Sequence, residues 1–197
     1  MSFIKEWIYR FRHNRGFGVQ SPAAFYFVMH VLREYPHPYY CYTQLNMMAR
    51  SAGDYPAAHC RRLFRISNYV EPRNIITLAD RKGCALAALS AGCNRAPRFA
   101  ASGIEDMKRH IGSIATIGLL HIGKTQHLAQ TIETALPYVD SKSVIIVEGI
   151  HRDSTTRKCW KSIVADPRVV ISMDLYSAGI LFFDTKYKKQ HYTFCFK

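Results

Sequence analysis

Residues 74–91 read NIITLADRKGCALAALSA and contain a short apolar strand, a polar turn and an alanine-rich helix. The predicted strand covers 74–79, and the turn that follows it ends at Gly83. In an open α/β sheet, the first turn of this kind lies where a nucleotide-like cofactor binds. Glycines there let the backbone approach the ligand, and the helix N-terminus offers unpaired N–H groups. Here the turn has a single glycine and two cations, Arg81 and Lys82, so the stretch predicts a cofactor site whose glycine-rich loop is reduced.

The chain has 197 residues, of which 48% are hydrophobic and 21% charged, as expected of one globular domain with a sizeable core. No apolar run approaches the roughly 18–20 residues needed to cross a bilayer. The N-terminus interleaves charges with aromatics and does not resemble a signal peptide. The six cysteines include no CxxC pair, so we expect reduced thiols in a cytoplasmic protein. The net charge of +13 would attract polyanions, which leaves open a nucleic-acid partner or a merely solvated basic surface.

Apolar periodicity alternates between helix and strand from residue 74 to residue 165, after which strand follows strand. The expected helices cover 3–11, 22–32, 57–70, 84–91, 104–111, 125–136 and 155–164, and the expected strands cover 74–79, 98–101, 114–122, 143–147, 168–174, 178–183 and 191–196. This order predicts a three-layer α/β fold, with a doubly wound, mostly parallel sheet and a C-terminal antiparallel β-hairpin.

The helical N-terminal part, residues 1–72, is expected to cap the α/β core at 73–197 as part of the same domain. Phe3, Trp7 and Phe11 form an aromatic stripe on the first expected helix. The stripe could pack on the chain itself, on a second copy in a homodimer, or on a membrane surface.

Several stretches resemble the bacterial small-molecule O-methyltransferases, a group of class I S-adenosylmethionine-dependent methyltransferases distantly similar to catechol O-methyltransferase. Besides 74–91, they are RHNRGFGVQSPAAFYFVMHVL at 12–32, ALPYVDSKSVIIVEGIH at 135–151, DPRVVISMDLYSAGILFF at 166–183 and KQHYTFCF at 189–196. The resemblance implies the same doubly wound sheet, with S-adenosylmethionine bound at the carboxyl ends of the first parallel strands. The short separation between the alanine-rich helix and the next buried strand leaves little room for the third strand of the family and its helix, so we expect a shortened sheet edge. It also implies O-methyl transfer to a small hydroxyl substrate.

The resemblance also implies which residues contact the cofactor: Leu78, Ala79, Asp80, Gly83, Ser102 and Gly103. The family ends its first strand with an acid followed by glycine, whereas this chain has Thr77 and Ala79 at those places. In the family, an acid after the second strand holds the ribose hydroxyls. Neutral Ser102 lies there in this chain, with Glu105 and Asp106 just beyond it. This change would remove charge-assisted hydrogen bonds worth ~1.5–3 kcal/mol each.

His121, Glu148 and His151 are the expected catalytic residues. His121 and Glu148 lie at the carboxyl ends of adjacent predicted strands, where ligand crevices form, and His121 or His151 could act as general base for a hydroxyl nucleophile. Alternatively, these are polar strand-end residues bonded to nearby backbone. One carboxylate and two imidazoles suit zinc or nickel better than the magnesium of the metal-dependent relatives, and we assign no metal. Three further histidines are expected on helix surfaces: His59, His110 and His127.

Three functions therefore remain open. The first is a working methyltransferase that uses S-adenosylmethionine on a small hydroxyl substrate. The second is a relative that has lost catalysis and serves as a binding or assembly module, which the missing ribose acid, the missing metal acids and the shortened sheet edge favour. The third is a basic RNA-associated protein, which only the net charge supports.

Overall fold

The computed structural model describes residue 19, residues 21–33 and residues 39–194. The expected helix at 3–11 and its aromatic stripe lie outside the described residues. In chain order, the described elements are α2 (Pro22–Tyr26), the π-helical segment η1 (Phe27–Leu32), α3 (Tyr42–Ala52), α4 (Ala57–Val70), β1 (Ile75–Leu78), α5 (Cys84–Gly92), β2 (Arg98–Ala101), α6 (Ile104–Ile114), β3 (Leu119–Ile122), α7 (Leu128–Ala135), the 3-10 turn η2 (Leu136–Tyr138), β4 (Val144–Glu148), α8 (Ser154–Ala165), β5 (Ile171–Asp174), β6 (Ala178–Phe182) and β7 (Gln190–Thr193).

The described strands form one seven-stranded sheet in the order β2-β1-β3-β4-β6-β5-β7. Strands β2, β1, β3 and β4 pair in parallel, β6 is antiparallel to both β4 and β5, and β5 is parallel to β7. The prediction of a mostly parallel sheet with a C-terminal antiparallel hairpin is confirmed. Strand β2 forms one edge of the described sheet, and β7 forms the other.

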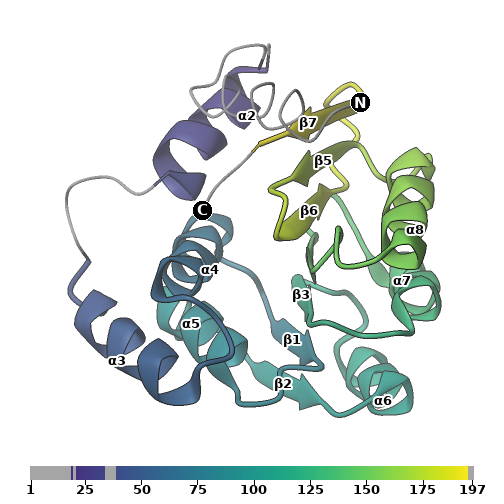
Figure 1. Ribbon diagram of the computed structural model, residues 1–197. Helices are drawn as coiled ribbons and strands as arrows, with labels where there is room; N and C mark the ends of the chain where they lie inside the picture. Colours follow the sequence, from purple (N-terminus) through teal and green to yellow (C-terminus); the bar gives the residue numbers. More distant parts are fainter. Residues whose placement is uncertain (1–18, 20, 34–38, 195–197) are drawn as a thin grey trace.

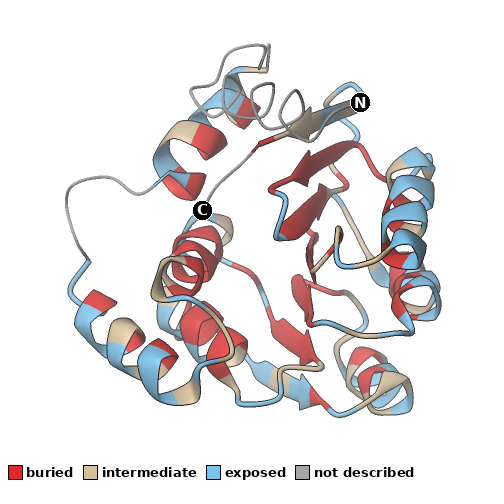
Figure 2. Cartoon of the chain, viewed as in Figure 1, coloured by how far each residue is buried: buried red, intermediate tan, exposed pale blue. Residues whose placement is uncertain are grey.

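Helices cover both faces of this sheet, so the fold has three layers (Figure 1). On one face, Leu119 and Ile146 pack with residues of η1, α4 and α5, and on the other face Leu120 packs with residues of α6, α7 and α8. The buried residues line the inner sides of these helices and both faces of the central strands (Figure 2). Successive side chains of a strand point to opposite faces. His121 and Glu148 therefore lie on the same face as Leu119 and Ile146, beneath α4.

The apolar run at 114–122 is divided between two elements, so the prediction of one continuous strand was wrong. Helix α6 continues to Ile114, and Ala115 ends it with a positive φ of 61°. Strand β3 begins at Leu119. Both the helix end and the strand have buried apolar residues, so hydropathy alone does not mark the boundary between them.

The side chain of Arg65 on α4 is buried, with 5% of it exposed. Its guanidinium donates to the carbonyls of Val31 (2.7 Å) and Leu32 (3.1 Å), and to the hydroxyl of Tyr42 (2.9 Å). Carbonyls at a helix end lack partners within the helix. Arg65 therefore joins α4 to the end of η1 and to the start of α3.

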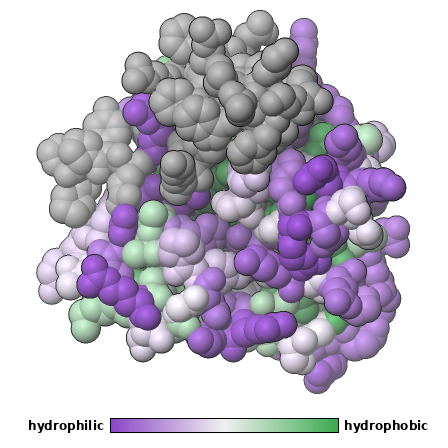
Figure 3. Space-filling view, viewed as in Figure 1, coloured by the Kyte–Doolittle hydropathy of each residue, from purple (hydrophilic) through white to green (hydrophobic). Residues whose placement is uncertain are grey.

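The side of the molecule drawn in Figure 3 shows mostly hydrophilic residues on its coloured surface. Among the residues that can be described, none of the helices has both the length and the apolar character needed to span a bilayer. The described cysteines are free thiols: Cys41, Cys60, Cys84, Cys93 and Cys159.

Candidate functional site

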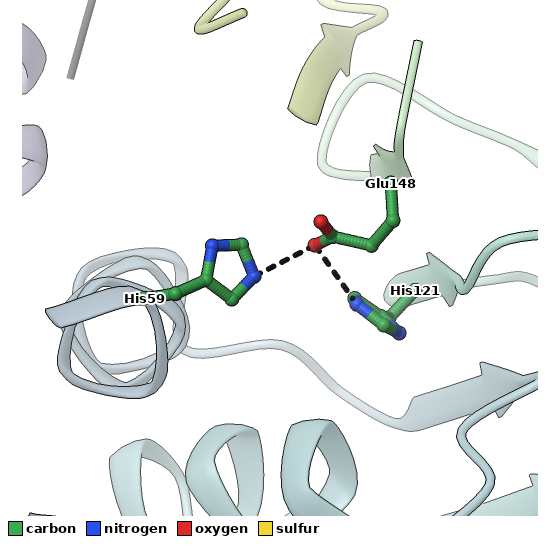
Figure 4. Close-up of side chains that lie close together, drawn as sticks. All are labelled: His59, His121 and Glu148. Atoms are coloured by element: carbon green, nitrogen blue, oxygen red, sulfur yellow. Dashed lines mark hydrogen bonds and ion pairs between the residues drawn. The ribbon is translucent and has the colours of Figure 1, made fainter. Parts of the chain in front are cut away.

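Two histidines and a glutamate meet beneath α4, where β3 and β4 reach their carboxyl ends (Figure 4). Nε2 of His59 lies 2.8 Å from Oε1 of Glu148, and Nε2 of His121 lies 3.2 Å from the same oxygen. All three residues are buried: His59 is 7% exposed, His121 is 0% exposed and Glu148 is 5% exposed. They come from α4, β3 and β4, so the pairing of neighbouring strands and the packing of α4 bring them together. We call these three residues the buried triad.

The two imidazoles keep Glu148 ionised. Burial alone would raise the pKa of Glu148, but the charges and hydrogen bonds of His59 and His121 outweigh burial and hold the pKa below its ordinary value. The triad therefore contains a buried carboxylate anion. The second ring nitrogen of His121, Nδ1, is buried with no hydrogen-bond partner in the described chain.

His59 was expected on the surface, and its burial corrects that prediction. The residue lies four positions before Leu63, which is buried against the sheet, so the two side chains share one face of α4. This spacing is the sequence signal for its inward position. Because histidine is polar, it is assigned to the surface when its acidic hydrogen-bond partner is distant in the sequence.

Tyr55 lies between the buried triad and an open cleft. Its ring stacks on His59, with centroids 5.0 Å apart, and meets His121 edge-on at 6.1 Å. Burial, followed by the negative charges of Glu148, Asp80 and Asp54, raises the pKa of Tyr55. The tyrosine therefore keeps its hydroxyl proton.

The cleft has a volume of about 880 Å³ and opens over the carboxyl ends of β1, β3 and β4. Its lining includes Tyr55 and residues that follow each of these strands: Ala79, Arg81, Lys124, Arg152 and Asp153. Ligand crevices of doubly wound sheets form at this edge. The cleft is therefore placed for ligand binding, and its lining carries three cations, Arg81, Lys124 and Arg152, and two acids, Asp54 and Asp153.

The turn after β1 has the backbone shape of a glycine-rich loop. Ala79 has a φ of 58° and Gly83 a φ of 72°, both in the left-handed region that favours glycine. A Cβ on Gly123 would lie 2.3 Å from the carbonyl oxygen of Ala79, so the end of β3 packs directly against this turn. A Cβ on Gly83 would have no atom within 4 Å, which leaves open space beside the start of α5. Asp80 accepts a hydrogen bond from the backbone N–H of Leu86 (2.8 Å) and so stabilises that turn.

No protein-family model matches the sequence, and no curated protein matches it. Solved structures do match the fold. An O-methyltransferase from Bacillus cereus, crystallised with SAH, is 15% identical and has a TM-score of 0.55 over 80% of this chain and 94% of that chain. The O-methyltransferase TomG from Streptomyces achromogenes, in complex with SAM, is 11% identical, with a TM-score of 0.52 over 94% and 100% of the two chains. A SAH-bound methyltransferase from Podospora anserina is 9% identical, with a TM-score of 0.53 over 83% and 96%.

The chain has the class I methyltransferase fold. The three matching chains are covered almost completely, so the likeness extends over the whole architecture.

In this class I methyltransferase fold, the carboxylate of Asp106 lies at the end of β2, although Asp106 itself belongs to α6. Both the backbone N–H and the hydroxyl of Ser102 donate to Oδ2 of Asp106, at 3.0 and 3.1 Å. These hydrogen bonds hold the acid of α6 against the strand end, and the bond from the Ser102 backbone is the main cause of a lowered pKa of Asp106. Gly103 is the N-cap residue of α6 and has an extended backbone. Leu78 is buried in the core.

His151 lies apart from the buried triad. Its Nε2 lies 2.6 Å from Oδ2 of Asp174 at the end of β5, and its ring stacks on Tyr176 with centroids 5.3 Å apart. Of the three expected catalytic residues, the class I methyltransferase fold thus brings together His121 and Glu148, and it gives His151 a different acid. Asp174 lies at the end of a predicted strand, and this position is the signal in the sequence that marks it as a candidate site residue.

Proposed function

We propose that the chain binds S-adenosylmethionine beside the turn after β1 and uses it to methylate a hydroxyl group of a small molecule in the cleft. The observation that carries this proposal is the shape of that turn. Ala79 has the left-handed backbone of the glycine it replaces, and the space beside Gly83 is open. This backbone cradle fits a ligand that approaches main-chain atoms closely.

The position of Asp106 supports the same ligand. The resemblance expects an acid after β2 to bind the ribose hydroxyls, and Ser102 occupies that place in the sequence. The side chain of Asp106 reaches the same strand end from the first turn of α6 and is 20% exposed. A carboxylate accepts hydrogen bonds from a diol, so Asp106 can take the role that Ser102 cannot.

The cleft would hold the methyl acceptor. Its volume of about 880 Å³ lies within the roughly 300–1,000 Å³ typical of ligand clefts. Arg81, Lys124 and Arg152 are exposed on its walls, and Arg152 donates to Asp153 at 2.9 Å. The exposed cations favour an acceptor that carries negative charge near its hydroxyl group.

S-adenosylmethionine, when bound, supplies an electrophilic methyl group to the acceptor oxygen. His151 is our candidate for the base that takes the hydroxyl proton, since its ring is partly exposed and Asp174 orients it. His121 is fully buried and bonds to Glu148, so we assign it no contact with the acceptor.

A binding module without catalysis is the second candidate. Thr77 and Ser102 replace two acids of the related enzymes, and Oγ1 of Thr77 is buried without a hydrogen-bond partner in the described chain. This candidate predicts binding of the cofactor without turnover.

Calorimetry of the full chain with S-adenosylmethionine and S-adenosylhomocysteine tests the proposal. Gly83→Asp would place a carboxylate in the open space and should abolish binding, while Gly83→Asn, similar in size but uncharged and tolerant of the left-handed backbone, should weaken it less. Absence of heat at millimolar ligand, or equal affinity in Gly83→Asp, would overturn the proposal. Methyl transfer from labelled cofactor to a panel of small hydroxyl compounds then separates the enzyme from the binding module.

A further inference from the structure

We propose that His59, His121 and Glu148 form a binding site for one transition-metal dication of the zinc class. Their ligand atoms, one from each side chain, all lie within 4.8 Å of one another. The site is separate from the proposed cofactor and acceptor sites, since Tyr55 lies between the triad and the cleft. The inference therefore does not depend on methyl transfer.

The spacing of the three donor atoms suits a small ion. Bonds from zinc to imidazole nitrogen and carboxylate oxygen are ~2.0–2.2 Å long, which places neighbouring donors of a tetrahedral ion roughly 3.3 Å apart. Oε1 of Glu148 lies 2.8 Å from His59 and 3.2 Å from His121. These two distances are close to that spacing, and the two imidazole donors also lie within 4.8 Å of each other.

The donor set selects the class of metal. Two imidazoles and one carboxylate match zinc and its neighbours among the transition metals, whereas magnesium and calcium prefer oxygen ligands. Three protein ligands also leave a fourth position for water. His59 brings a ligand from α4, so this donor set differs from the strand-end acids of the metal-dependent relatives.

Charge and hydrogen bonding favour occupation. Within the described chain, Glu148 bonds to the two imidazoles and to no lysine or arginine. A dication among the three donors would place a full positive charge beside this buried carboxylate while the imidazoles remain neutral ligands. The free Nδ1 of His121 also allows the imidazole proton to sit on that nitrogen, which leaves the lone pair of Nε2 directed at the ion.

Metal binding here would join α4 to the carboxyl ends of β3 and β4. The three ligands are separated by 89 positions between His59 and Glu148 and by 27 between His121 and Glu148. An ion that binds the folded chain and not the unfolded chain stabilises the fold by mass action. We therefore expect a higher melting temperature with the metal.

The test uses the full chain, first stripped with a chelator and then titrated with Zn²⁺ alone. We expect one equivalent of tightly bound zinc and a raised melting temperature. His59→Gln and His121→Gln should lose both effects, while His127→Gln, a change at an exposed histidine, should keep them. No tight binding by the wild type, or unchanged binding by His59→Gln, would overturn the proposal.

If the glutamine variants do not fold, cobalt substitution tests the metal site instead. Co²⁺ in the wild-type site should give the visible absorption of a four-coordinate ion and strongly shifted NMR signals from the N–H protons of two imidazoles. His59→Cys should bind Co²⁺ and add a thiolate charge-transfer band. A wild-type cobalt spectrum of a six-coordinate, aqueous-type ion would reject the site.

Discussion

Nε2 of His59 lies 2.8 Å from Oε1 of Glu148, and this contact joins the middle layer of the fold to α4. Removing one partner of a buried charged pair leaves the other poorly compensated, at a cost of about 3 kcal/mol. His59→Ala should lower the free energy of unfolding by that amount in metal-free protein, measured by urea denaturation. His127→Ala is the control and should change it by less than about 0.5 kcal/mol, as exposed substitutions do. An equally small change in His59→Ala would contradict the structural importance of this contact.

Ala79 has a φ of 58°, which an L-residue with a Cβ adopts at a cost of about 1–2 kcal/mol. Ala79→Gly should relieve this strain. Part of the gain is offset by the greater freedom of glycine in the unfolded chain, so we expect up to about 1 kcal/mol of stabilisation. Ala79→Val should destabilise the fold. A destabilised glycine variant in urea denaturation would show that the left-handed turn is not strained.

Gly179 on β6 lies against the indole of Trp160 on α8. A Cβ there would be 2.3 Å from Cη2 of Trp160, so Gly179→Ala must displace the ring, at an overpacking cost of about 1–3 kcal/mol. Gly112→Ala makes the same change inside α6, where no atom lies within 4 Å, and should stabilise the helix by about 0.5–1 kcal/mol. Thermal unfolding of the two variants should therefore shift in opposite directions. A shift in the same direction would argue against the packing described for Trp160.

Asp106 should matter for the cofactor. Asp106→Ala removes the carboxylate at the end of β2 and should weaken S-adenosylhomocysteine binding roughly tenfold or more. Glu105→Ala, which removes the neighbouring exposed acid on α6, is the matched control and should leave the affinity unchanged. Equal affinities of the two variants by calorimetry would exclude Asp106 from the site.

Asp153 begins α8 and accepts a hydrogen bond from the backbone of Thr156 (2.7 Å). This bond is the main cause that lowers the pKa of Asp153 from 3.8 to about 2. Because the folded-state pKa is lowered, the carboxylate contributes stability above pH 3.8 that is lost as the pH falls towards 2. The difference in urea midpoint between the wild type and Asp153→Ala should therefore be constant near neutral pH and narrow across this interval. Asp153→Asn, which keeps a capping side chain, should lose less at neutral pH.

The sequence predicts the fold well because local signals agree with it. The alternation of strand and helix after residue 74 follows hydrophobic periodicity, and the hairpin forms around Tyr176, as the pattern on either side of it predicts. The rules for parallel connections then limit the strand orders that such a sheet can have. These signals involve residues that are close together in the sequence, so a single sequence is enough to detect them.

The site is less predictable, because its contacts are distant in the sequence. His59 bonds to an acid 89 positions away. Arg65 is buried because a carbonyl of η1 accepts a hydrogen bond from its guanidinium, and the hydrophobic pattern of α4 does not reveal that acceptor. A polar side chain can be assigned to the interior only when its partner is known.

The outer position of β2 has a consequence for the behaviour of the protein in concentrated solution. No described strand pairs with its free side, and Arg98 and Ala100 are exposed along it. Unpaired backbone at such a margin can recruit a strand from another molecule and start aggregation. Arg98 places a positive charge there, and mutual repulsion between like-charged copies opposes that association. Loss of this arginine would therefore reduce solubility before it changed the fold.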